Sequence, residues 1–297
     1  MNHAERLLAE ARTATDAIME SWAERLLSSG DGDGPALAYA LRSPGKRVRA
    51  ALVMASYRAL GGTSPAIAAV AAAVETVHTY SLVHDDLPCM DNDDLRRGRP
   101  TTHRAFDVGT ATRVGYRLVP AAALVLAEAA RELDLDDDTL GHMAAELFQA
   151  SGIEGMVGGQ WLDLEAEQRA LDLAELTAVH RGKTGALIRA ACILGASAAR
   201  PSAAAQAALA SYGEEIGLAF QVADDVLDVT ATSDVLGKTA GRDEALQKST
   251  FVRLMGVDGA RAEAARLARA AVDHLDRAGI RSESLLALAD YIVNRKS

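Results

Sequence analysis

Apolar residues recur at helical spacing along most of this chain, and strict alternation of apolar and polar residues is almost absent. The first run covers about 4–27 and ends at the glycine-rich segment 29–35. Two later runs cover 64–85 and about 201–229. The pattern predicts an all-α protein, and we expect a single domain over residues 1–297.

Helix-breaking and capping residues place the remaining elements. A second long helix is expected to open at 43–49 and to end at Gly61-Gly62, with Lys46 and Arg49 on one helical face. Ser64 is the expected N-cap of the next helix, with Pro65 in its first turn. The segment 105–120 has no clear period and a helix is expected from about 121 to 133, while 259–297 reads as two further helices.

Composition narrows the class of protein. The chain has 297 residues, 49% of them hydrophobic, and a net charge of -10, which argues against a nucleic-acid partner. No stretch approaches the roughly 20 apolar residues that span a bilayer. Cys89 and Cys192 are the two cysteines, and so few favour a reduced, cytoplasmic chain.

The first candidate site is an acidic cluster that follows an apolar helical run. Five aspartates precede three arginines within 84–99, namely Asp85, Asp86, Asp91, Asp93 and Asp94, then Arg96, Arg97 and Arg99. Crowded carboxylates repel one another unless cations lie among them. Pro88 disfavours helical geometry at Leu87, so the helix should end or kink there and return Asp91 towards Asp85. The cluster is either a solvated turn or a place for a diphosphate bound through magnesium.

A second acidic stripe lies on the predicted helix 201–229. Gln221, Asp224, Asp225 and Asp228 are spaced so that they share one face, and the turn before them is apolar on nearly every side. An acidic stripe is ordinarily the wet face of a helix, but this helix looks buried, so its carboxylates need cations. Lys238 follows in the loop 230–250.

At this point the chain resembles the short-chain trans-prenyl diphosphate synthases, the farnesyl and geranylgeranyl diphosphate synthase family. The resemblance covers most of the chain. It rests on Gly45-Lys-Arg-Val-Arg49, the run from His78 to Gly98, Gly158-Gly-Gln160, Lys183-Thr-Gly-Ala-Leu187, the run from Phe220 to Asp228, and Gly237-Lys238.

The resemblance implies an isoprenoid-synthase-type helical bundle around a central cavity, usually a homodimer. It also implies three Mg²⁺ ions per active site, two on Asp85 and Asp91 with Asp86 in support, and the third on Asp224. Asp225 and Asp228 would hold the waters of that third ion.

For the substrates, the resemblance implies an allylic diphosphate on Arg96, Lys183 and Lys238, with isopentenyl diphosphate beside it on Lys46, Arg49, His78 and Arg97. Without the resemblance, His78 is better explained as a structural histidine. The diphosphate leaves, the double bond of isopentenyl diphosphate attacks the allylic cation, and the Thr184 hydroxyl and Gln221 amide turn their dipoles towards it.

Product length depends on the helix below Asp85. Tyr80 is the expected floor of the product pocket, and the smaller Ser81 beside it would not block a growing chain. We expect fifteen-carbon farnesyl diphosphate from a dimethylallyl or geranyl starter, with ten or twenty carbons as alternatives.

Gly115-Tyr-Arg117 departs from the Gly-Asp pair that is usual in the family, and this change affects the expected shape of the product pocket. A class I terpene cyclase or a non-catalytic partner subunit are more remote interpretations. The first is disfavoured by Asp224, Asp225 and Asp228, and the second because every aspartate is retained.

Overall fold

The structure is a computed structural model that describes residues 1–166, 169–230 and 249–295. Within these residues the chain is helical apart from loops and one two-stranded hairpin, so the all-α prediction is confirmed. The elements are α1 His3–Ser28, α2 Gly34–Leu41, α3 Val48–Ala59, α4 Ile67–Asp85, β1 Leu95–Arg96, β2 Arg99–Pro100, α5 Thr102–Ala105, α6 Val108–Glu132, α7 Asp137–Ser151, α8 Met156–Glu165, α9 Leu173–His180, the π-helical turn η2 Arg181–Gly185, α10 Ala186–Ala198, α11 Ala203–Thr230, α14 Phe251–Arg277 and α15 Glu283–Asn294.

Three local predictions are wrong, each for a physical reason. α4 begins at Ile67, and the Ser64 hydroxyl accepts from the Ala66 N–H, so Ser64 stabilises the preceding turn and is not the N-cap. α3 begins at Val48, because Arg47 before it adopts a left-handed conformation with φ 55°. Lys46 therefore precedes the helix and does not share a helical face with Arg49.

The third wrong prediction concerns α6, which runs without interruption from Val108 to Glu132 and contains Pro120. A proline inside a helix removes one hydrogen bond and crowds the carbonyl four residues earlier. Pro120 and Tyr116, which carries that carbonyl, are both exposed, so water can bind the freed oxygen. The Asp107 side chain caps the start of α6 by accepting from the Thr110 N–H over 2.8 Å.

α4 lies in the middle of the bundle and is buried on nearly all sides over its first three turns, which explains its apolar sequence. It packs against α1, α3, α6 and α10, and α11 packs against α10 and α14. Two hydrophobic clusters result, and Val293 of α15 contacts both. That the chain forms one domain over residues 1–297 stays a prediction. No described helix has the length and hydropathy needed to cross a bilayer.

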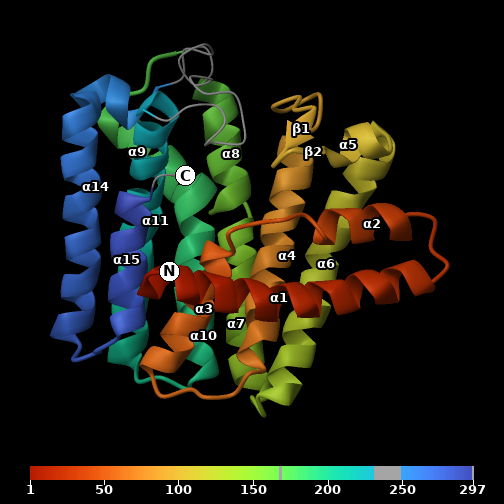
Figure 1. The fold of residues 1–297 in the computed structure, drawn as a ribbon, viewed down its shortest axis with the longest axis horizontal. Coiled ribbons are helices and arrows are strands. Elements are labelled where there is room, and N and C mark those ends of the chain that lie inside the picture. Colours follow the sequence, from red (N-terminus) through yellow and green to blue (C-terminus); the bar gives the residue numbers. More distant parts are fainter. Residues whose placement is uncertain (167–168, 231–248, 296–297) are drawn as a thin grey trace.

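The arrangement of α4 and α11 positions the two acidic stretches. Both helices run towards the upper side of the bundle in Figure 1, and the β1–β2 hairpin lies just beyond the end of α4. The aspartates at the carboxyl end of each helix therefore belong to the same end of the molecule.

The contact between α8 and η2 is unusually close. A Cβ atom on Gly159 would lie 2.0 Å from the backbone nitrogen of Lys183, and one on Gly182 would lie 3.0 Å from the Gly159 Cα. Only glycine fits at Gly159, and its absence of a side chain lets the two backbones touch. This contact sets the position of Lys183 relative to α8.

Candidate active site

The first aspartate cluster is organised by a sharp turn at the end of α4. Asp85 is the last helical residue and Asp86 is the C-cap. The backbone N–H of Asp91 donates to the carbonyl of Asp85 over 2.8 Å. The turn around Pro88 thus returns Asp91 to Asp85, which confirms the sequence prediction for this segment.

The charges around Asp85 are not balanced by the protein alone. The pKa of the Asp85 carboxyl is raised to about 6, chiefly because burial penalises its ionised form. The positive charge of Lys183 opposes this shift, and the carboxylates of Asp91 and Asp86 add to it. A divalent cation among these oxygens would relieve the repulsion, and carboxylate oxygen is the ligand that Mg²⁺ prefers.

Asp86 and Arg96 form an ion pair within this cluster. The Arg96 Nε donates to Asp86 Oδ1 over 2.6 Å, and its Nη2 lies 3.4 Å from Asp93 Oδ2. Burial raises the pKa of the Asp86 carboxyl and the Arg96 charge opposes that effect. Arg96 is therefore fixed by aspartates at the entrance of the cluster, and its contact with an allylic diphosphate stays a prediction.

On α11 the three aspartates have different surroundings. Asp225 is buried, its Oδ1 accepts from the Gln221 amide over 3.3 Å, and its Oδ2 accepts from the Phe251 N–H over 2.8 Å. Asp228 is also buried. Asp225 thus holds the first turn of α14 against α11, a structural task in addition to the water-binding role predicted for it.

Asp224 is the more exposed member of the stripe and it is bound by Arg295. The Arg295 Nη2 donates to Asp224 Oδ1 over 2.6 Å, and the exposed fractions of the two side chains are 2% and 44%. Arg295 also donates to the carbonyls of Phe220 and Ile292, and its guanidinium lies 3.9 Å from the centroid of the Phe220 ring. The C-terminal arginine is thus fixed independently of the aspartate that it holds.

The carboxylates fit a magnesium site by their chemistry, although they are not gathered into one. Among residues 1–166, 169–230 and 249–295, no group of three or more His, Cys, Asp or Glu side chains is close enough to hold a metal ion. The number of ions and their individual ligands stay predictions.

Between the two acidic helices lies a short series of polar contacts. Lys183 on η2 donates to Asp163 Oδ2 of α8 over 2.6 Å, and its charge also acts on Asp85. The neighbouring Thr184 hydroxyl donates to Gln221 Oε1 over 3.0 Å. The structure thus brings Lys183, Thr184 and Gln221 together as predicted. Lys238 lies outside the described residues.

The loop before α3 is held by buried ion pairs. Arg47 has only 5% of its surface exposed, and its guanidinium bonds to Glu75 over 3.3 Å and to Asp16 over 2.7 Å. Glu75 also accepts from the Ala50 N–H over 3.2 Å. Glu75, a single carboxylate in the apolar part of α4, therefore anchors the loop that carries Lys46.

The other cations predicted for isopentenyl diphosphate converge on this loop. Arg49 Nη1 lies 3.5 Å from His78 Nε2 across α3 and α4. Arg97, on the hairpin, donates to the Pro44 carbonyl. Burial lowers the pKa of His78 well below 6.5, and the charges of Arg49 and Arg97 lower it further. Burial likewise lowers the pKa of Lys46. Four residues predicted for one diphosphate thus come from four separate segments to one place.

Further down α4, an aromatic contact series connects Tyr80 to α6. The Tyr80 and His84 rings meet edge to face at 5.1 Å between centroids, and His84 and Tyr116 do so at 5.3 Å. A Cβ on Gly115 would lie 1.9 Å from His84 Nε2, so a larger residue there would have to displace the His84 ring. The Ser81 hydroxyl donates to the His78 carbonyl over 2.9 Å. Tyr80 is therefore fixed on its α6 side.

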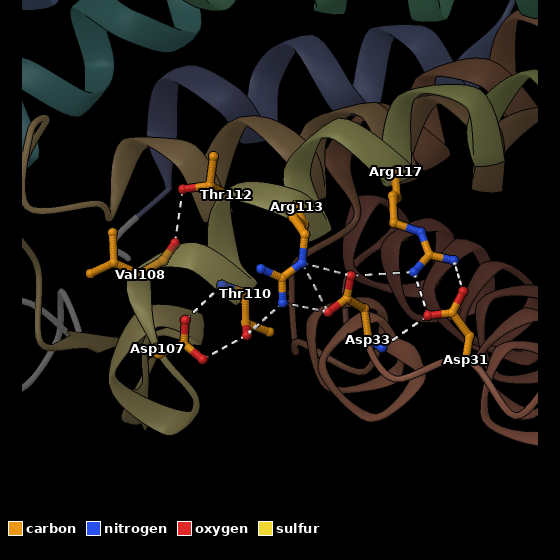
Figure 2. A network of polar contacts seen from close by, with 8 residues as sticks. All are labelled: Asp31, Asp33, Asp107, Val108, Thr110, Thr112, Arg113 and Arg117. Atoms are coloured by element: carbon orange, nitrogen blue, oxygen red, sulfur yellow. Dashed lines mark hydrogen bonds and ion pairs between the residues drawn. The ribbon is translucent and has the colours of Figure 1, made fainter.

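Figure 2 shows the ion pairs formed by α6 around the segment that departs from the family pattern. Arg117 Nη1 donates to Asp31 Oδ1 over 2.6 Å, and Arg113 Nη2 donates to Asp33 Oδ1 over 2.8 Å. Arg117 lowers the pKa of the Asp31 carboxyl to about 2. The arginines of α6 thus tie it to the loop between α1 and α2.

Sequence reasoning missed three charged residues that hold the site, namely Glu75, Asp163 and Arg295. Two of them carried a signal. Glu75 is an acid in an apolar helical run, and Asp163 is an acid in the last turn of a helix, where the dipole disfavours negative charge. Nothing in the sequence near Arg295 indicates that it meets Asp224.

A cavity of about 850 Å³ lies on the outer side of the α8–η2 contact. Its lining includes Ile153, Trp161, Arg181 and Glu214, and none of the residues predicted to bind metal or substrate. The cavity is therefore distinct from the end of the bundle that carries the aspartates of α4 and α11.

Comparisons with known proteins agree with this geometry. The polyprenyl synthetase family model matches residues 35–282. The farnesyl diphosphate synthase of Escherichia coli is 47% identical over 255 residues, which is 84% of this chain and 85% of that protein.

Solved structures agree as well. An apo crystal structure of an FPP/GFPP synthase from Zymomonas mobilis superposes with a TM-score of 0.85 at 36% identity, covering 98% of each chain. A Helicobacter pylori geranyltransferase, solved with magnesium and isoprenyl diphosphate, has a TM-score of 0.81 at 29% identity and covers 99% of this chain and 97% of its own. These matches extend over nearly the whole chain, and the protein is a member of the polyprenyl synthetase family, with the all-α fold of the isoprenoid synthases.

Proposed function

We propose that the protein is a Mg²⁺-dependent prenyltransferase that condenses isopentenyl diphosphate with an allylic diphosphate to give a trans-prenyl diphosphate. The product that we propose is farnesyl diphosphate. The observation that carries the proposal is the pairing of two aspartate-bearing helix ends, α4 and α11, at one end of the bundle. The farnesyl product is supported by the E. coli relative. Geranylgeranyl diphosphate is the alternative, since plant geranylgeranyl pyrophosphate synthases are 40% identical.

Mg²⁺ bound by Asp85, Asp91 and Asp224, with Asp86, Asp225 and Asp228 in support, would supply positive charge to the leaving diphosphate. Magnesium use is supported by the H. pylori structure, and we propose three ions per site. Each of these aspartates lies on or next to α4 or α11. The oxygen ligands of both helices therefore belong to the same end of the bundle.

The residues of the chain would act on the substrates by charge and dipole. Lys183, Arg96 and Lys238 would hold the allylic diphosphate, and Lys46, Arg49, His78 and Arg97 would hold isopentenyl diphosphate. The C–O bond of the allylic substrate breaks with its electron pair leaving on the diphosphate. The double bond of isopentenyl diphosphate then attacks the cation, and a proton leaves to the departed diphosphate.

Thr184 and Gln221 are placed to stabilise that cation. Their side chains are hydrogen-bonded to each other next to Lys183, so their dipoles are fixed before the reaction begins. The reaction also requires that water be kept from the cation, because water would convert it to an alcohol.

We also propose a homodimer in the cytoplasm. Two apolar side chains of α6, Tyr116 and Leu124, have 67% and 57% of their surface exposed, which supports a second copy covering this helix. Cys89 and Cys192 are both free, which fits a reducing compartment.

Incubation with Mg²⁺, excess isopentenyl diphosphate and each allylic starter, followed by sizing of the products by mass, tests the activity. We expect a fifteen-carbon diphosphate, no condensation in EDTA, and a loss of kcat by orders of magnitude in Asp85→Ala and Asp224→Ala. Full activity of Asp224→Ala, or in EDTA, would contradict the metal-dependent mechanism. Diphosphate release from an allylic substrate alone would indicate a cyclase instead.

A further inference from the structure

The ion pair between Lys183 and Asp163 is placed where its role extends beyond stability. Lys183 Nζ donates to Asp163 Oδ2 over 2.6 Å, which is slightly shorter than most charge-assisted hydrogen bonds between an ammonium and a carboxylate. The exposed fractions of the two side chains are 26% and 19%, so the pair is only partly screened by water. Asp163 is not itself predicted to bind metal or substrate. It bonds to Lys183, which is predicted to bind the allylic diphosphate.

The backbone explains why these two residues meet. Gly159 touches the backbone of Lys183, and Asp163 lies one helical turn after Gly159 on the same face of α8. Asp163 is also in the last turn of α8, which contains no basic residue and where the helix dipole opposes a carboxylate. The Lys183 ammonium compensates that unfavourable position.

Lys183 also interacts with a second set of anions. Its charge acts on Asp85 of α4, and the carboxylates of Asp85 and Asp91 in turn act on Lys183. The ammonium therefore bonds to Asp163 and is also near enough to Asp85 and Asp91 for their charges to act on it. Without Asp163, the anions left to attract it are Asp85 and Asp91.

We infer that Asp163 is a positioning residue that holds the Lys183 ammonium away from Asp85 and Asp91, and so keeps these two carboxylates open to a divalent cation and the ammonium open to the allylic diphosphate. The inference rests on the proposed function. Asp163 does not touch substrate or metal in this account, and it acts through Lys183.

The test measures metal binding without substrate. Isothermal titration of the whole protein with Mg²⁺ is compared among the wild type, Asp163→Asn, Asp163→Glu, Lys183→Met and the double variant Asp163→Asn/Lys183→Met. In Asp163→Asn the freed ammonium would pair with Asp85 and Asp91, and Mg²⁺ would have to displace it. We therefore expect Mg²⁺ binding to weaken about 10-fold, which corresponds to the loss of one charge-assisted contact. Asp163→Glu keeps the anion and should retain most of the affinity.

The double variant separates competition from a general structural effect. If the displaced ammonium is what blocks the aspartates, removing it should restore Mg²⁺ affinity to that of Lys183→Met. The matched control is Glu165→Gln, which removes a charge from the same helical turn at an exposed position and should bind Mg²⁺ as the wild type does. In steady-state kinetics, Asp163→Asn should raise the allylic KM and leave the isopentenyl KM unchanged.

Two outcomes would overturn the inference. One is an unchanged Mg²⁺ affinity in Asp163→Asn, whether or not its melting temperature falls. The other is no recovery of Mg²⁺ affinity in the double variant. If Asp163→Asn does not fold, Lys183→Met decides, because removing a competing ammonium should leave Mg²⁺ affinity equal to the wild type or higher, and a weaker affinity contradicts the competition. Failure of the wild type to condense the substrates would overturn the proposed function instead, and the metal titrations would still decide the role of Asp163.

Discussion

The guanidinium of Arg295 donates to the Asp224 carboxylate over 2.6 Å, so the last described residue of the chain is bonded to α11. The arginine is almost fully buried, whereas the aspartate remains partly exposed. Because only Oδ1 takes part in this bond, the arginine fixes the orientation of Asp224 while leaving Oδ2 for another partner.

Replacing Arg295 should therefore reduce stability. Arg295→Met removes the donor to the Phe220 carbonyl, and Arg295→Lys keeps the charge but not the planar group that lies on the Phe220 ring. We expect both to lower the free energy of unfolding by about 1–3 kcal/mol in urea denaturation. Arg269→Met, at an exposed position on α14, is the control and should stay within about 0.5 kcal/mol of the wild type. Equal stability of all three variants would refute a structural role for the pair.

Asp85→Asn should show a conflict between stability and activity. The pKa of Asp85 is raised to about 6, so the folded state binds this proton more tightly than the unfolded state. The stability due to that proton is complete below about pH 4 and is lost as the pH rises through 6. In EDTA at pH 7.5, Asp85→Asn should therefore melt above the wild type, by up to about 3 kcal/mol of unfolding free energy, while its kcat collapses.

The same comparison at pH 4 is the internal control, because Asp85 is then protonated in the folded wild type and most of the stability difference should disappear. A wild type that is the more stable protein at pH 7.5 in EDTA would show that the carboxylate is better paired than we describe.

Arg97→Ala and Lys183→Ala should separate the two substrates. Arg97 lies with the Pro44 loop, Arg49 and His78, whereas Lys183 bonds to Asp163 and interacts electrostatically with Asp85. Arg97→Ala should mainly raise the isopentenyl KM, by the equivalent of about 1.5–3 kcal/mol for one charge-assisted contact, and Lys183→Ala the allylic KM. If both variants raised only the allylic KM, the assignment of the two sites would be wrong.

His78 should remain neutral throughout the physiological range. Burial and the charges of Arg49 and Arg97 hold its pKa well below 6.5, so the unfolded state takes up the proton first as the pH falls. Stability is therefore full above about pH 6.5 and decreases below it. His78→Gln should flatten this part of the melting curve, and NMR of the imidazole nitrogens should show a neutral ring at pH 6. A cationic ring at that pH would contradict the prediction.

Tyr80→Ala should lengthen the product. The Tyr80 ring contacts His84, which in turn contacts Tyr116 of α6, so both rings support Tyr80 on the side of α6. Mass spectrometry should show twenty carbons or more from Tyr80→Ala. If the wild type already makes twenty carbons, Tyr80 is not the floor of the pocket.

The helices could be predicted from sequence because their apolar period is strong, and the turn at Pro88 because proline restricts the residue before it. The start of α3 could not, because the left-handed conformation of Arg47 depends on its buried pairing with Glu75, a residue 28 positions away. The prediction that Lys46 belongs to α3 was wrong for the same reason.

The candidate site divides in the same way. Motifs predicted the aspartates, Lys183, Thr184 and Gln221. Thr184 bonds to Gln221 and Gln221 to Asp225, whereas the aspartates of the two helices are not gathered into one metal site among the described residues. The motifs did not predict Asp163 or Arg295, because the spacing of residues along one helix says nothing about which charged group of another helix will meet it. Partners of this kind are set by packing and are visible only in three dimensions.

The π-helical turn η2 changes the direction in which the side chains of α10 point relative to those of α9. Such a turn holds one residue more than an α-helical turn, which rotates everything after it by about 100°. The buried residues of α9, Leu176 and Val179, accordingly join one hydrophobic cluster, while Leu187 and Ile188 of α10 join the other. Deleting a single residue here would leave both aspartate motifs intact in the sequence and yet turn one helix out of step with its neighbours. A relative with that deletion would still carry both aspartate motifs, but the lysine that corresponds to Lys183 would point in a different direction.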